Sequence, residues 1–208
     1  FFHSLRLAVG VALTRAALVL LGRPELTYAL GGPTPRICRQ FVDYRGDHVT
    51  HQHFELPLVL AIDALVGRVR IIDVNLLPPR EVAPLNLPNY DDWVLREALH
   101  NCVAHQDYAQ GGRILVTESP DTLRFFNYGE FLPGSVDKVL HAAQPEPRYR
   151  NACLANAMVE LDLMETINSG VKGMFRKQRE RFFPLPDYAI EGPPSSVSVT
   201  IYGRTLDE

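Results

Sequence analysis

One segment of the sequence, WVLREALHNCVAHQDY at residues 93–108, carries side chains whose types and spacing suit chemistry. Glu97, Asn101 and His105 recur at intervals of four, so on a helix they lie along one edge. Together a carboxylate, an amide and an imidazole offer a general base, an oxygen ligand for a hard cation and a polar contact to phosphate. The same spacing also fits an ordinary solvated edge. Asn is a poor residue for an indifferent mid-helix position, which favours a site.

A helix must present that edge, and the flanking residues predict one. Asp91 and Asp92 suit a helix start, because their carboxylates accept hydrogen bonds from the first turn, and we expect the helix to run to about His105. Six apolar residues at helical spacing form its buried stripe: Val94, Leu95, Ala98, Leu99, Cys102 and Val103.

The residues after this helix predict further elements. Gly111-Gly112 precede two strands, 113–118 and 122–127, joined by a turn at 119–121. The stretch 128–149 is rich in Gly and Pro and is longer than a plain connection, which indicates a functional or mobile loop. Helices are predicted at 151–165 and from Ser169-Gly170 to Arg181, and a closing strand at 196–203.

The amino-terminal part predicts a helix over residues 5–22, with Gly22 as its C-cap. This apolar segment is long enough to span a bilayer, but Arg6 and Arg15 interrupt it and no leader or cleavage pattern flanks it. We therefore expect an amphipathic or buried helix rather than a membrane span or signal.

The next residues predict a linker at 23–35, a strand at 36–44 and a helix at 56–71. Four prolines within 77–90 exclude a helix or a central strand there. The main boundary is therefore expected near residue 80.

Composition indicates an ordinary globular protein of 208 residues, with 46% hydrophobic residues and a net charge of −3. It excludes a mostly disordered chain and argues against a polybasic surface over the whole chain. Three separated cysteines without a CxxC pair predict neither a disulfide framework nor a cysteine zinc site, so we expect a reducing cytosol. Since the chain starts Phe1-Phe2 without Met, we expect it to be a piece of a longer protein.

Two further groups leave alternatives open. His48, His51 and His53 are compatible with a metal site, but their spacing matches no standard motif and a polar hairpin edge also explains them. The basic segment 172–181 fits nucleic-acid contact, a solvated helix face or a dock for another domain.

The motif REALHNCVAHQDY (96–108) resembles R-E-A-L-x-N-A-x-x-H-R-D-Y, the helix motif of a divergent histidine-kinase-type ATPase module. This module occurs in predicted bacterial transcriptional regulators, after a Schlafen-type AlbA-like domain. FFNYGEFLPG (125–134) is similar to the strand and N-P-G-x-L-P element of the family, and residues 148–174 are similar to its S-R-N-P-x-L-A … G-S-G-I-x-x-M run. The resemblance covers most of the chain and is strongest over 93–203.

The resemblance implies an α/β fold (an α+β sandwich) of the gyrase, Hsp90, histidine-kinase and MutL type. We expect a mixed, mostly antiparallel sheet with helices on one face, a Bergerat-type ATP-binding fold, and an amino-terminal helix and strand appendage. It divides the chain into 1–22, the helical end of a preceding domain, 23–80, a linker with a strand and a helix, and 81–208, the ATPase-like domain.

The same resemblance implies ATP and Mg²⁺ as cofactors. Glu97 would polarise the attacking water, and Asn101 would coordinate the Mg²⁺ that bridges the phosphates. His105 is assigned to cofactor binding by its position in the motif. Nucleotide contacts are assigned to Asn127, Gly129, Gly134, Arg148, Arg150, Ser169 and Gly170. The implied protein is a nucleotide-binding module of a cytoplasmic transcriptional regulator. The regulator would contact DNA only through domains outside this chain. No membrane partner is expected, and the chain could form a homo-oligomer.

Three departures from the motifs predict weak binding and slow or absent hydrolysis. Asn127 replaces the carboxylate that holds adenine in the wider superfamily, Asn168 replaces a glycine before Ser169-Gly170, and Gln106 removes a positive charge. The alternative is a degenerate module that binds no nucleotide and acts as a scaffold for dimerisation or domain interaction.

Overall fold

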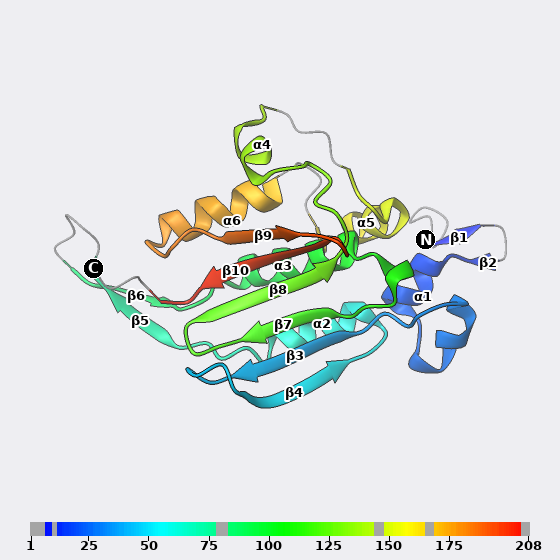
Figure 1. Ribbon diagram of the computed structural model, residues 1–208, viewed down its shortest axis with the longest axis horizontal. Coiled ribbons are helices and arrows are strands. Elements are labelled where there is room, and N and C mark those ends of the chain that lie inside the picture. The colour runs from blue at the N-terminus through cyan, green and yellow to red at the C-terminus, as the bar shows by residue number, and fades with distance from the viewer. Residues whose placement is uncertain (1–6, 10–11, 78–82, 144–147, 165–168, 205–208) are drawn as a thin grey trace.

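A six-stranded sheet in the order β4-β3-β7-β8-β10-β9 dominates the fold (Figure 1). The computed structural model describes residues 7–9, 12–77, 83–143, 148–164 and 169–204. The strands are β3 (Ile37–Val42), β4 (His48–Phe54), β7 (Ile114–Glu118), β8 (Thr122–Tyr128), β9 (Asp187–Glu191) and β10 (Ser196–Tyr202). Neighbouring strands run antiparallel except β3 and β7, which are parallel. The expected mixed, mostly antiparallel sheet is confirmed.

Helices cover one face of this sheet, also as expected. The helices are α1 (Arg15–Leu21), α2 (Leu58–Val66), α3 (Asp92–His105), α5 (Ala152–Glu160) and α6 (Ser169–Glu180). In Figure 1 α2 and α3 lie behind the strands, while α5 and α6, which contact α3, are seen above β9. Successive residues of a strand point to opposite faces, and Ile114, Val116 and Phe125, which point to the helices, are at most 2% exposed. The apolar stripe predicted for α3 is buried against them.

Both ends of α3 are fixed by side chains. The Asp91 carboxylate accepts a hydrogen bond from the Val94 N–H at 3.1 Å, as a helix N-cap does. At the other end Asn151 Nδ2 donates to the carbonyl oxygens of Ala104 (3.1 Å) and Gln106 (2.8 Å). These contacts satisfy carbonyl groups that a helix end leaves unpaired, and they join the start of α5 to the end of α3.

The helix predicted over residues 5–22 is wrong in its first half. Ala8–Val9 (β1) and Ala12–Leu13 (β2) pair as a small sheet, and among the described residues of this segment α1 alone is helical. Thr14 explains the later start, because its hydroxyl accepts a hydrogen bond from the Ala17 N–H at 3.2 Å and so caps the helix there. Gly22 is the C-cap, as predicted. Within the described residues no helix has the length and apolar character needed to cross a membrane.

The segment 23–80 contributes to the main sheet. Its predicted strand and helix form as β3 and α2, and β4 extends the sheet beyond them. A 3₁₀ helix, Pro24–Leu30, lies within the expected linker. The proline-rich stretch 77–90 follows β5 (Asp73–Leu76) and contains β6 (Leu85–Pro88), and these two strands pair as a separate two-stranded sheet.

Two later predictions change in detail, and one strand is additional. The stretch 128–149 contains a short helix, α4 (Val136–His141), because Ser135 Oγ accepts a hydrogen bond from the Lys138 N–H and caps it. α5 ends at Glu160 rather than 165, since Asp162 adopts a left-handed conformation with φ of 55°. β9 was not predicted.

Candidate functional site

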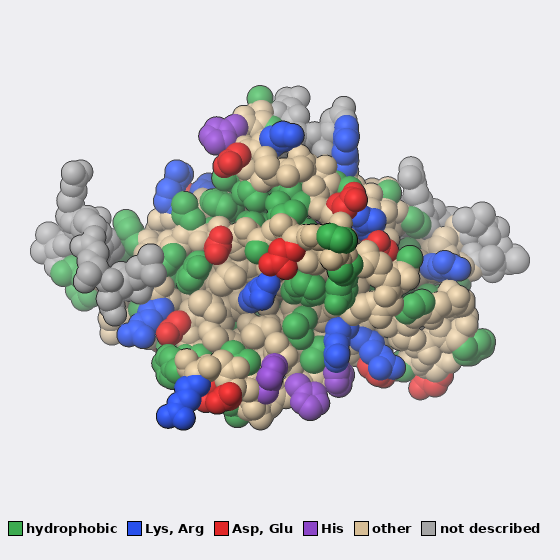
Figure 2. All heavy atoms as spheres, viewed as in Figure 1, with side chains coloured by type: hydrophobic (Ala, Val, Ile, Leu, Met, Phe, Trp, Pro, Cys, Tyr) green, Lys and Arg blue, Asp and Glu red, His purple; other side chains and the backbone are tan. Residues whose placement is uncertain are grey.

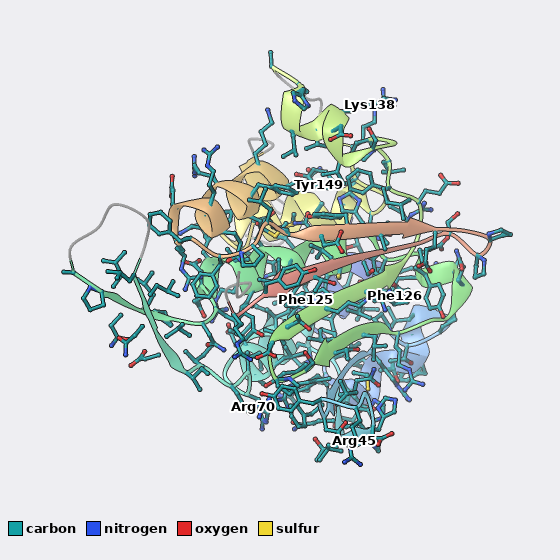
Figure 3. The ribbon with its side chains drawn as sticks, turned by 60° about the vertical axis from the view of Figure 1, so that its left-hand side comes forward. Arg45, Arg70, Phe125, Phe126, Lys138 and Tyr149 are labelled. Carbon is teal, nitrogen blue, oxygen red and sulfur yellow. The ribbon has the colours of Figure 1, made fainter. Side chains whose placement is uncertain are left out.

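A cavity of about 470 Å³ lies between the helix-covered face of the sheet and helices α3, α4 and α6. This volume falls in the range of about 300–1,000 Å³ that small-molecule sites occupy. Three lining residues are labelled in Figure 3: Phe125 on β8, Lys138 on α4 and Tyr149 just before α5. Most of the wall is apolar and comes from Phe125, Phe131, Leu132, Val139, Met164, Val171, Met174, Val197 and Val199.

Six of the predicted site residues meet in this cavity. They come from α3, β8, the segment before α5 and the start of α6, so the fold gathers side chains that are far apart in the sequence. These residues are Glu97, Asn101, His105, Asn127, Arg148 and Gly170.

Glu97 and Asn101 contact each other on α3. Asn101 Nδ2 donates to Glu97 Oε1 and to the Glu97 carbonyl oxygen, at 2.8 Å in both cases. The donor of the amide is therefore engaged, while within the described residues its Oδ1 accepts no hydrogen bond. Oδ1 is thus the atom that Asn101 can offer to a cation.

The Glu97 carboxylate lies against the first turn of α6. A Cβ atom at Gly170 would come within 1.9 Å of Glu97 Oε1, so only glycine leaves room for the carboxylate. A helix N-terminus attracts negative charge, and Glu97 therefore stands where phosphate was expected to approach. Asn168 and the side chain of Ser169 lie outside the described residues.

His105 forms a neutral part of the wall. Burial, and then the positive charge of Arg150, lower the pKa of His105 to about 4. Its ring lies 5.6 Å from that of Tyr149, and the two planes are tilted by 33°. Burial and the nearby Glu97 carboxylate raise the pKa of Tyr149, so this side chain also stays neutral at physiological pH.

Asn127 presents an oriented amide from β8. It is 5% exposed, and its Nδ2 donates to the Tyr128 carbonyl oxygen at 3.0 Å. Among the described residues its Oδ1 accepts no hydrogen bond. Asn127 therefore keeps an acceptor, which is what an exocyclic amino group of a base requires.

Three predicted residues, Gly129, Gly134 and Arg150, do not line the cavity, and the side chain of a fourth, Ser169, lies outside the described residues. Gly129, with φ of 131°, lets Arg150 pack closely, because a Cβ there would lie 3.0 Å from Arg150 Nε and 2.8 Å from the His105 carbonyl oxygen. Arg150 itself forms an ion pair with Asp107 at 3.5 Å. Gly134, with φ of 85°, shapes the turn before α4, and Ser169 begins α6. Gly129 and Arg150 therefore pack behind His105, which lines the cavity.

Lys138, Tyr149 and Tyr188 line the cavity but were not predicted as site residues. Lys138 belongs to α4, which Lys172 holds against α6 by donating from Nζ to the Ala142 carbonyl oxygen at 2.5 Å. Tyr188 belongs to β9 and stacks on Phe175. The adjacency of Tyr149 to Arg148 and Arg150 was the one sequence signal that could have found it.

The structure places Gln106 outside the cavity wall, and the weak binding predicted from its neutral side chain stays a prediction. Gln106 is 1% exposed and does not line the cavity. Its Nε2 donates to the Gly112 carbonyl oxygen at 3.1 Å, and its Oε1 accepts from the Tyr128 N–H at 3.0 Å. The side chain joins the end of α3 to β7 and β8.

The two remaining sequence candidates lie elsewhere. The three histidines lie on the exposed edge strand β4, and within the described ranges no three His, Cys, Asp or Glu side chains are grouped to hold a metal ion. Two basic side chains of 172–181 contact other elements, since Lys177 pairs with Asp91 at 3.5 Å and Arg181 donates to the Pro88 carbonyl oxygen, whereas Arg176 and Arg179 are exposed. One side of this helix is therefore packed, and the other carries exposed arginines.

Comparisons with known proteins agree with this architecture. Residues 111–201 match the family described as "Putative ATP-dependent DNA helicase recG C-terminal", an ATPase-like family. The crystal structure of the DIP2311 protein from Corynebacterium diphtheriae is similar over 98% of this chain and 40% of its own, with a TM-score of 0.74 and 18% identity. This chain therefore spans less than half of that protein and shares its α+β fold. No curated protein matches the sequence.

Proposed function

We propose that this chain is a nucleotide-binding regulatory module that takes ATP with Mg²⁺ and hydrolyses it slowly or not at all. The observation that carries the proposal is the meeting of Glu97, Asn101, Asn127 and Arg148 in one cavity. The match of residues 111–201 to an ATPase-like family supports an ATPase-like module in this part of the chain.

The residues of the cavity fit the groups of Mg²⁺-ATP. Asn127 Oδ1 suits the amino group of adenine, and the apolar wall suits the plane of the base. Asn101 Oδ1 suits Mg²⁺, which supplies charge neutralisation to the phosphates when bound. Arg148 and Lys138 add positive charge, and Glu97 is the carboxylate that can orient a water.

Regulation would follow from occupancy of the cavity. A nucleotide beneath α4 stabilises the 129–150 segment in one arrangement and so changes how flanking domains pack on it. On this proposal those domains include a Schlafen-type AlbA-like domain, the whole protein is a cytoplasmic bacterial transcriptional regulator, and recognition of duplex DNA belongs to the other domains.

The second candidate is a scaffold that binds no nucleotide. It is favoured by the Glu97 carboxylate, which occupies the space beside Gly170 at the start of α6. A phosphate that approaches this helix end meets a negative charge, unless a cation accompanies it.

The deciding experiment is a calorimetric titration of the chain with ATP and ADP, each with and without Mg²⁺. We expect ATP binding that strengthens with Mg²⁺ in the parent and loses this Mg²⁺ dependence in Asn101→Ala. Asn86→Ala, on the exposed strand β6, is the matched control and should bind as the parent does.

Absence of heat and of thermal stabilisation at millimolar ATP would support the scaffold and end the nucleotide proposal. Equal Mg²⁺ dependence in the parent and in Asn101→Ala would remove Asn101 from the cation site.

A further inference from the structure

The sheet face opposite the helices carries a surface that the proposed nucleotide site does not use. In the described part of the chain the helices lie on the other face, and Figure 2 looks onto this one. Its central strands are β8, β7 and β3, with β4 at one edge. A sheet face without a covering layer is accessible to a partner of extended shape.

Aromatic and basic side chains alternate onto this face from β8. Arg124, Phe126 and Tyr128 point away from the helices, whereas Phe125 points toward them, and Figure 3 shows Phe125 and Phe126 on opposite sides of the strand. The rings of Phe126 and Tyr128 are 5.1 Å apart at 84°. Arg124 is exposed, and its Nε donates to Ser198 Oγ at 3.1 Å.

Polar side chains continue across this face of the sheet from β8 to the edge strand β4. Gln40 on β3 donates from Nε2 to Thr117 Oγ1 on β7 at 2.8 Å. His51 on β4 is opposite Gln40, and the rings of His51 and His53 lie 5.5 Å apart. Both histidines are exposed, and side chains of this type appear in purple along the lower edge of Figure 2. Aromatic rings therefore stand at both sides of a hydrogen-bonding surface.

The charged side chains that these four strands expose on the open face are basic. The acidic residue of these strands is Glu118, which is buried toward the helices and held by Arg39 and Arg70. Exposed Arg113 immediately precedes β7, while Arg124 lies on β8. Negative charge gathers instead on β9, with Asp187 and Glu191. The aromatic part of the face thus suits an anionic partner, and β9 limits its extent.

We propose that this face binds single-stranded nucleic acid, with bases stacked on Phe126 and Tyr128 and phosphates contacted by Arg124. Single strands expose the flat sides of their bases, and aromatic side chains on an open sheet with nearby arginines bind them with little dependence on sequence. Duplexes hide these base faces and fit the surface less well. The proposal is independent of ATP and goes beyond the nucleotide site.

The test is fluorescence polarisation of a labelled oligonucleotide of about fifteen residues, as oligo-dT and as oligo-U, against a hairpin duplex. All titrations are made without ATP, so their outcome is separate from that of the nucleotide proposal. We expect binding of single strands that weakens at least about fivefold in the double variant Phe126→Thr/Tyr128→Thr. Threonine keeps the strand propensity of these positions.

Two further variants sharpen the test. Arg124→Gln should weaken binding and reduce its salt dependence, because one phosphate contact is lost. Tyr28→Thr removes an aromatic ring that is 80% exposed on the 3₁₀ helix Pro24–Leu30, and it should bind as the parent does. If the double variant does not fold, Phe126→Leu removes the ring while keeping an apolar side chain.

Three results would overturn the proposal. These are no polarisation change up to about 100 µM protein, unchanged affinity in folded aromatic variants, and a dimer in sedimentation that the aromatic variants dissociate. The last result would assign the face to a second copy of the chain.

Discussion

Gln106 shows how one side chain can secure the geometry of a site that it does not touch. Its side-chain amide donates to the Gly112 carbonyl oxygen and accepts from the Tyr128 N–H. Its main-chain carbonyl oxygen accepts from Asn151 Nδ2. The end of α3, the start of β7, the end of β8 and the start of α5 therefore meet at one buried residue. His105, which lines the cavity, is the residue immediately before this junction.

Gln106→Ala should lower the free energy of unfolding by about 2–4 kcal/mol, because two hydrogen bonds are lost and buried backbone groups of Gly112 and Tyr128 lose their partners. Urea denaturation measures the change. Gln110→Ala, on the exposed 3₁₀ helix that follows, is the control and should stay within about 0.5 kcal/mol of the parent. Equal losses in the two variants would mean that the junction is not stabilising.

The residues of the cavity were predictable where helical spacing places them or, for Asn127, Arg148 and Gly170, where the family motifs do. Glu97, Asn101 and His105 follow from helical period, since four-residue spacing fixes one edge of α3 whatever surrounds it. The role of Gln106 did not follow, because its partners at Gly112 and Tyr128 are set by the packing of a hairpin against a helix end. Lys138 and Tyr188 depend likewise on where α4 and β9 lie.

At the scale of elements, two glycines determine how closely α6 approaches α3. A Cβ at Gly173 would come within 2.4 Å of the Trp93 ring, just as one at Gly170 would meet the Glu97 carboxylate. Trp93 and Glu97 are one helical turn apart on α3, and so are Gly170 and Gly173 on α6. The two helices therefore pack through two contacts, Gly170 against Glu97 and Gly173 against Trp93, and the cavity wall between α3 and α6 depends on both contacts.

Gly173→Ala should displace α6 from α3 and lower the free energy of unfolding by about 1–3 kcal/mol, despite the better helix propensity of alanine. Trp93 is the single tryptophan of the chain, so its fluorescence emission reports the displacement directly. Gly32→Ala is the control, because a Cβ there meets nothing within 4 Å. An unshifted emission maximum in Gly173→Ala would contradict the close packing.

The elements themselves follow from sequence where caps and patterns are strong. α3 was predicted to the residue at its carboxyl end, because Asp91 caps one end and the apolar stripe covers the rest. β4 and β9 are edge strands with exposed side chains, so the alternation that reveals a half-buried strand is weak in them. The first half of 5–22 is apolar enough for a helix, and Thr14 overrides that composition locally.

At the scale of the whole molecule, stability should depend on two neutral histidines. Burial, and then the positive charge of Arg96, lower the pKa of His100 to about 4, as burial and Arg150 do for His105. An unfolded chain binds protons at these residues near pH 6.5, before the folded chain does. The free energy of unfolding is therefore not reduced by these two histidines above about pH 6.5. As the pH falls from 6.5 toward 4, protonation of the unfolded chain progressively lowers it.

His100→Met should reduce the loss of unfolding free energy between about pH 7.5 and 4.5, by on the order of 2 kcal/mol. The residue is 3% exposed, so a neutral side chain of similar size can occupy the site without a charge to desolvate. Urea titrations across this pH range measure the slope, with His48→Gln on exposed β4 as the control. Parallel pH profiles for parent and His100→Met would contradict this assignment.

The parallel pairing of β3 with β7 has a consequence for how the chain reaches its fold. Arg39 and Glu118, on these two strands, are 79 positions apart, so the sheet closes only after a long loop has been ordered. Such non-local pairing slows folding relative to a helical bundle. Until β3 pairs with it, β7 presents an unpaired edge that begins with three apolar residues, Ile114 to Val116. A chain cut near residue 81 would keep that edge permanently, with the aggregation risk of any exposed strand.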